Sequence, residues 1–174
     1  NIAPASEEEL KKAHVIFAFS DSKMRDGSPG PGNEIIAKTA RDLHARYGKP
    51  VLAQEEVYLA AQKVCPDIDF LYVARGPKHG KSETKWNTAA ITDLFFAECR
   101  LHNWSRAIID TTPDHMPRCI WVAEKRDLHA IAAKMPDGEY FHPDLALWAC
   151  RGNWLRFRIR EFAVRILFLL LRDI

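Results

Sequence analysis

This sequence of 174 residues has only a small excess of positive over negative charge, and it has no long hydrophobic run. Lysine and arginine total 25 against 23 aspartates and glutamates, so the net charge of +2 offers no whole-chain argument for nucleic-acid binding. The longest uncharged apolar run near the end, residues 166–171, is too short to span a bilayer. We therefore predict no nucleic-acid partner and no membrane-spanning segment.

Cysteine is sparse and scattered, and the common catalytic motifs are missing. No C-x-x-C pair indicates a zinc ribbon or a redox dithiol, so we expect reduced, mostly buried thiols. The sequence contains neither H-E-x-x-H nor paired His/Cys spacing, and we predict no metal. It also lacks G-x-S-x-G, which argues against an α/β-hydrolase serine. The four cysteines are Cys65, Cys99, Cys119 and Cys150.

The N-terminus shows no signal peptide. The chain begins with Asn1 rather than methionine, and residues 7–9 are three consecutive glutamates. We expect a cytoplasmic protein, or an envelope-associated one if an upstream segment has been removed.

Strand and helix patterns alternate along the chain. Apolar runs predict strands at 14–19, 50–53, 68–74 and 106–110, and an edge strand at 139–141. Helical spacing predicts helices at 33–47, 55–64, 82 or 84 to 102, and 119–124. This order is typical of an α/β fold: a three-layer α/β/α, Rossmann-like domain with a mostly parallel sheet. We take residues 1–174 as one such domain with a helical C-terminal segment at about 143–174.

A loop rich in glycine and proline, residues 21–32, follows the first predicted strand. Asn33 is expected to cap the next helix, with Glu34 in its first turn. A loop that opens into a helix N-terminus suits an anion, because free N–H groups and the helix dipole favour negative charge. The loop matches neither G-x-G-x-x-G nor the Walker pattern, so a plain surface loop is the alternative.

A second polar stretch, residues 75–87, follows another predicted strand. Its basic side chains precede a helix start that carries Ser82 and Thr84. Together they could hold a phosphate, sulfate or carboxylate, or form only a solvated basic loop.

The third and most informative stretch is residues 110–118, which follows a short apolar run. His115 could act as a general acid or base, and Arg118 lies one helical turn further on. Asp114 would sit near the positive end of the helix dipole. In the alternative interpretation, Thr112 and Asp114 are only caps and His115 packs on the surface.

Ligands of open parallel sheets bind outside the carboxyl ends of the strands. We therefore predict one small-molecule site, with His115 as acid or base and Arg118 as an anion clamp. The other expected ligand-binding residues are Ser20, Asp21, Gly30, Gly32, Asn33, Glu34, Thr84, Asn87, Thr111, Thr112 and Asp114.

The order of these motifs resembles the YdcF/SanA/ElyC-like family, bacterial Rossmann-like proteins of largely unknown function. Residues 84–87 match its Thr-x-x-Asn motif, and residues 111–118 match its Thr-x-x-x-His-x-x-Arg motif. The resemblance covers about 14–135, and it departs from the family at Trp86, where an acidic residue is usual. Members of that family are linked to cell-envelope maintenance. For this chain the resemblance implies only an anionic or nucleotide-like ligand, with a nucleotide or S-adenosylmethionine as cofactor candidates.

The C-terminal segment is basic and amphipathic. Residues 151–174 hold six arginines against Glu161 and Asp173, a local charge of +4. One interpretation is a helix that packs on the sheet as part of the core. The other is a non-catalytic interaction module that docks on an anionic membrane surface or a protein partner. The apolar positions at helical spacing are Leu155, Ile159, Phe162, Ile166 and Leu169.

Overall fold

Strands and helices alternate around one parallel sheet. The computed structural model describes residues 2–75 and 88–136, together with Tyr140, Ile159, Phe162, Ala163 and Ile166. The strands of this described part are β1 (Val15–Ala18), β2 (Val51–Gln54), β3 (Tyr72–Ala74), β4 (Arg106–Asp110) and β5 (His129–Ala132). The helices are α1 (Glu7–Lys11), α2 (Pro31–Tyr47), α3 (Glu55–Val64), α4 (Thr88–His102) and α5 (Met116–Glu124).

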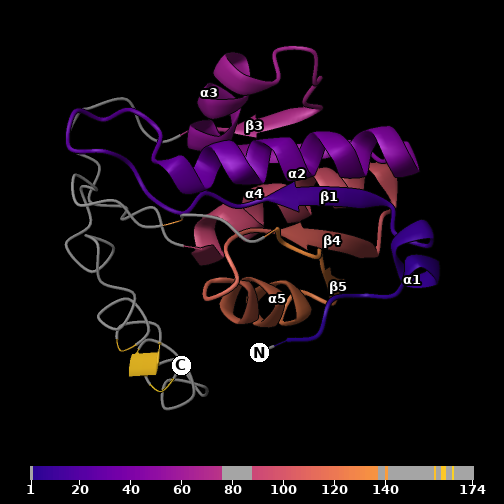
Figure 1. Cartoon of the computed structure of the whole chain (residues 1–174). Helices are drawn as coiled ribbons and strands as arrows, with labels where there is room; N and C mark the ends of the chain where they lie inside the picture. The colour runs from indigo at the N-terminus through magenta and orange to yellow at the C-terminus, as the bar shows by residue number, and fades with distance from the viewer. Residues whose placement is uncertain are drawn as a thin grey trace.

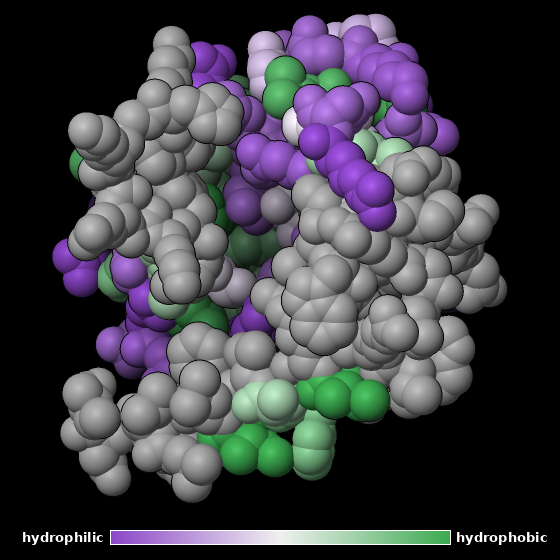
Figure 2. All heavy atoms as spheres, turned by 90° about the vertical axis from the view of Figure 1, so that its left-hand side faces the viewer, coloured by the Kyte–Doolittle hydropathy of each residue, from purple (hydrophilic) through white to green (hydrophobic). Residues whose placement is uncertain are grey.

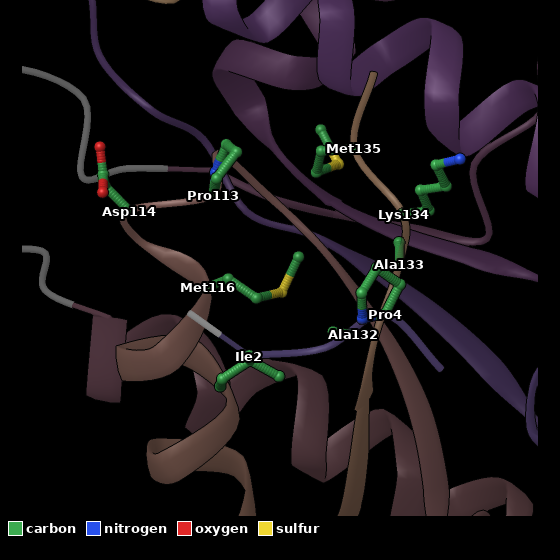
Figure 3. Close-up of a pocket in the computed structure, with 9 residues that line it drawn as sticks. All are labelled: Ile2, Pro4, Pro113, Asp114, Met116, Ala132, Ala133, Lys134 and Met135. Carbon is green, nitrogen blue, oxygen red and sulfur yellow. The ribbon is translucent and has the colours of Figure 1, made fainter. Parts of the chain in front are cut away.

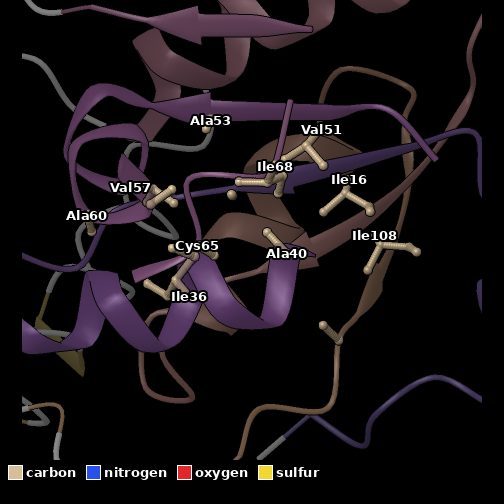
Figure 4. Packing of buried hydrophobic residues seen from close by; sticks show 14 of the residues in the cluster. Ile16, Ile36, Ala40, Val51, Ala53, Val57, Ala60, Cys65, Ile68 and Ile108 are labelled. Carbon is tan, nitrogen blue, oxygen red and sulfur yellow. The ribbon is translucent and has the colours of Figure 1, made fainter. Parts of the chain in front are cut away.

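The sheet has five parallel strands in the order β3-β2-β1-β4-β5, with helices on both sides (Figure 1). Side chains of β1 alternate between two cores, as a strand buried on both faces requires. Ile16 packs with α2 and α3, whereas Phe17 packs with α4 and α5. Figure 4 shows the first of these cores. The predicted three-layer α/β/α fold is therefore confirmed.

The strand order places a switch point between β1 and β4. These neighbouring strands pair in parallel, and Ala18 lies opposite Asp110 at their carboxyl ends. The helix that follows β1 covers one face of the sheet, and the helix that follows β4 covers the other. The two connecting loops therefore leave in opposite directions, which is the arrangement that opens a ligand crevice in sheets of this kind.

Several element boundaries differ from the predictions. Helix α2 begins at Pro31 with Gly30 at its N-cap, so the prediction that Asn33 caps it is wrong. Pro31 suits the first helical position because it has no N–H to leave unpaired. Strand β3 is shorter than predicted, α5 begins before Cys119, and β5 was not predicted. Tyr140 is not in a strand, and the rest of 139–141 lies outside the described residues.

The C-terminal segment differs from the expectation that its apolar face packs on the sheet. Ile159, Phe162 and Ile166 are helical but 59%, 64% and 41% exposed, so the interpretation of this face as core is wrong for these three. Leu155 and Leu169 lie outside the described residues. Helical spacing reveals an apolar face, but not what covers it. In the described part of the chain, no helix is long and apolar enough to cross a membrane.

Three cysteines, Cys65, Cys99 and Cys119, are free and buried, as expected. Burial raises the pKa of the Cys99 thiol to about 12 and also raises the pKa of Cys65. Neither thiol is a reactive thiolate at neutral pH, because a thiol reacts when its pKa is lowered. Cys150 lies outside the described residues.

Candidate functional site

The loop after β1 is tied to its neighbours by backbone hydrogen bonds. The Phe19 N–H donates to the Asp110 carbonyl at 3.0 Å, and the Ser20 N–H donates to Gln54 Oε1 at 2.8 Å. These two bonds hold the start of the loop against the carboxyl ends of β4 and β2. Figure 2 looks onto this edge of the sheet, where both hydrophilic and hydrophobic residues of the described part of the chain are visible.

Asn33 serves as an internal clamp on this loop. Its side chain is fully buried; Oδ1 accepts from the Asp21 N–H at 2.9 Å, and Nδ2 donates to the Ser22 carbonyl at 2.6 Å. An amide that bonds two backbone groups in this way holds the loop and has less capacity left for a ligand. The structure thus places Asn33 at the predicted edge, but in a supporting position.

The N-terminus of α2 already has a carboxylate of its own chain beside it. A Cβ built on Gly32 would lie 2.9 Å from Asp21 Oδ2, so with any other residue here the Asp21 side chain would have to shift. A carboxylate at the first turn complements the helix dipole. Glu34 points elsewhere, because it pairs with Lys63 of α3 at 2.5 Å. An anionic ligand at α2 would therefore compete with Asp21.

Unsatisfied polar atoms gather at the end of β4, the strand that pairs with β1. Asp110 and Thr111 are fully buried, and Thr112 is 2% exposed. Both carboxyl oxygens of Asp110 and both threonine hydroxyls have no hydrogen-bond partner among the described residues. An unsatisfied buried polar group costs roughly 1–3 kcal/mol, so three such residues in a row point to a function.

The position of Asp110 in the sheet accounts for its electrostatics. It pairs with Ala18, and its side chain faces the α2 side like that of Ile108 two residues earlier. Burial without a charged partner raises the pKa of the Asp110 carboxyl well above its ordinary value. A protonated carboxyl is neutral and can donate one hydrogen bond as well as accept others.

His115 and Arg118 are in contact with each other. Arg118 Nε lies 3.2 Å and Nη2 3.0 Å from His115 Nδ1. Since arginine only donates, Nδ1 must accept, and the imidazole proton is therefore on Nε2. His115 is 6% exposed and stands at the cap position of α5.

A cavity of about 300 Å³ adjoins this loop (Figure 3). Met116 lies at its centre, with the N-terminal segment on one side, and the Ala5 N–H bonds the Ala132 carbonyl at 3.0 Å to hold that segment beside β5. The sequence analysis missed the cavity, because the segments that build it are far apart in the chain. Its lining residues are Ile2, Pro4, Pro113, Asp114, Met116, Ala132, Ala133, Lys134 and Met135.

The structure brings the predicted site residues into two groups at one sheet edge. The β1 loop and the start of α2 carry Ser20, Asp21, Gly30, Gly32 and Asn33, and the β4 loop and α5 carry Thr111, Thr112, Asp114, His115 and Arg118. Thr84 and Asn87 lie outside the described residues. The sequence analysis did not single out Asp110, although it ends the buried run before the motif. Within ranges 2–75 and 88–136, no group of three His, Cys, Asp or Glu residues could hold a metal.

Comparison with known proteins assigns no family. No protein-family model and no curated protein matches the chain. One similar solved structure is the complete multifunctional pyruvate carboxylase from Rhizobium etli, with 10% identity and a TM-score of 0.33. The match covers 68% of this chain and 10% of that enzyme, so this chain spans a small part of its length. A likeness this low carries no argument about function.

Proposed function

We propose that this protein binds an anionic or nucleotide-like small molecule in the crevice between the carboxyl ends of β1 and β4. The observation that supports the proposal is the run of buried, unsatisfied polar groups on Asp110, Thr111 and Thr112. It stands at the switch point of the sheet, where ligands of such folds bind. A ligand that pairs with these groups would offset the cost of burying them.

The ligand must displace part of the β4–α5 loop to reach these atoms, because they are shielded from solvent. Once there, it would meet two hydroxyls and the Asp110 carboxyl, whose raised pKa favours the neutral form, and these groups can donate hydrogen bonds. Arg118 supplies the cation on the α5 side, and a guanidinium matches carboxylate and phosphate oxygens well. Because Arg118 is on α5 and the Asp21 carboxylate is at α2, we propose that the anionic group of the ligand lies on the α5 side, away from Asp21.

The role of His115 follows from its pairing with Arg118. An imidazole that accepts from Arg118 through Nδ1 carries its proton on Nε2, and we propose that a bound ligand would receive this N–H at an oxygen that bears or develops negative charge. Acting as a general base through Nδ1 would require Arg118 to move away first. If the bound molecule is a substrate, we therefore propose stabilisation of an oxyanion as the first contribution of His115.

A thermal-shift screen of nucleotides, S-adenosylmethionine and sugar phosphates tests the proposal. A ligand at 100 times its dissociation constant should stabilise the fold by about 2.7 kcal/mol. We expect Thr112→Val and Arg118→Gln each to weaken binding by about tenfold, as loss of one hydrogen bond or one charge predicts. Arg41→Gln is the matched control, because Arg41 is exposed and pairs with Asp42 on α2.

Two outcomes would count against the proposal. A ligand that shifts the wild type, Thr112→Val and Arg118→Gln equally binds somewhere else. No thermal shift with any of the compounds, together with no co-purified small molecule in native mass spectrometry, would leave the crevice without a ligand and overturn the assignment.

A further inference from the structure

The C-terminal segment carries an apolar helical face that the described fold does not cover. Ile159, Phe162, Ala163 and Ile166 are all helical and all exposed. Their spacing of three, four and seven residues from Ile159 puts them on one side of a helix. Three large exposed apolar side chains on one face mark an interaction surface rather than scattered surface residues.

The charge of the same segment indicates what the face meets. Residues 151–174 carry a net charge of +4, and Arg158, Arg160 and Arg165 are sequence neighbours of the exposed apolar residues. The sequence therefore combines these exposed apolar residues with nearby cations, a composition that is typical of helices that lie in a membrane interface.

Two other occupants fit this pattern less well. A second copy of this segment would bring its own net charge of +4 against the same face, and like charges in contact oppose association. Nucleic-acid phosphates would pair with the arginines but leave Phe162 and Ile166 without an apolar partner. An anionic lipid surface provides both an apolar layer and negative headgroups.

We propose that the face formed by Ile159, Phe162, Ala163 and Ile166 docks on an anionic membrane surface, with the helix lying in the plane of the interface. The apolar side chains enter the boundary between headgroups and acyl chains, and the flanking arginines meet the headgroups. This proposal uses none of the residues of the proposed ligand site between β1 and β4, so each proposal can fail without the other.

Co-sedimentation of the full chain with vesicles tests the proposal. We expect binding to vesicles of 70% phosphatidylcholine and 30% phosphatidylglycerol, weak binding to pure phosphatidylcholine, and loss of binding in 0.5 M salt. Because each large side chain that enters the interface contributes about tenfold, Phe162→Ser with Ile166→Ser should lower the partition coefficient by about 100-fold. Replacing Arg158, Arg160 and Arg165 together by glutamine should lower it on the order of 100-fold, on the anionic vesicles only.

The matched control is Leu59→Ser with Leu71→Ser, since both leucines are exposed apolar residues elsewhere on the molecule. It should leave vesicle binding unchanged. The proposal is overturned by equal binding to both vesicle types, by no binding to either, or by an equal loss in the control. A lower melting temperature of the Phe162→Ser, Ile166→Ser protein would overturn it too, because the face would then pack on the domain. If the wild-type protein is a dimer and the Phe162→Ser, Ile166→Ser protein is a monomer, the face binds a second copy of the chain instead.

Discussion

Removing one buried hydroxyl should make this protein more stable. Thr112 is 2% exposed, and its Oγ1 has no hydrogen-bond partner in the described part of the chain. Valine has nearly the same shape and the same branching at Cβ, so Thr112→Val removes the polar atom without opening a cavity. The cost of an unsatisfied buried group is roughly 1–3 kcal/mol. We expect a gain of about 1 kcal/mol, which for a chain of this size raises the melting temperature by about 2–4 °C.

Thr92→Val provides the matched control. Thr92 is also fully buried, but its Oγ1 donates to the Thr88 carbonyl at 2.7 Å. Losing that bond should destabilise the fold by about 0.5–1.5 kcal/mol, the opposite sign to Thr112→Val. Urea unfolding followed by circular dichroism measures both, with an unchanged slope showing that the difference is one of stability. If Thr112→Val is destabilised as much as Thr92→Val, then the Thr112 hydroxyl does have a hydrogen-bond partner. That result would refute the argument from unsatisfied polar groups at Asp110, Thr111 and Thr112.

Two further predictions concern the same edge of the sheet. Since the folded-state pKa of Asp110 is raised above 3.8, the native state holds a proton that the unfolded state releases, and stability falls as pH rises from about 4 towards the raised pKa. Asp110→Asn should remove this part of the pH dependence of the urea midpoint, and an unchanged pH profile would show that Asp110 is not the group responsible. Gly32→Ala places a methyl group against Asp21 and should cost about 1–3 kcal/mol in thermal unfolding, whereas wild-type stability would show that this carboxylate moves aside freely.

Predictions from local signals agree well with the structure. Helix α3 spans 55–64 as predicted, and α2 ends at Tyr47 with Gly48 in the left-handed conformation at φ 64°. Such features depend on the residues within one turn or one short run, so the chain alone reveals them. Strand β5 was missed for the opposite reason: His129–Ala132 is short and rich in alanine, and parallel pairing with β4 makes it a strand.

The buried face of α4 shows where periodicity is ambiguous. Ala90, Leu94, Ala97 and Leu101 recur at helical spacing and would form an apolar stripe, but Leu101 is 75% exposed. The buried positions are Ile91, Thr92, Phe95 and Cys99. Apolar residues occur all around this helix, so spacing alone could not choose a face. The ring of Phe95 packs with those of Phe17, Phe19 and Tyr72, and these contacts across the sheet select the face.

In the candidate site, too, some features follow from local sequence and others depend on tertiary packing. The residue order placed His115 and Arg118 one helical turn apart after a buried strand, because helical geometry is local, and the structure shows the two side chains in contact. The orphaned carboxyl of Asp110, the clamp made by Asn33 and the cavity at Met116 required the packed molecule. Burial and hydrogen-bond satisfaction depend on atoms supplied by distant segments. No window of the sequence contains those atoms, and they assemble only when the sheet forms and both layers of helices close over it.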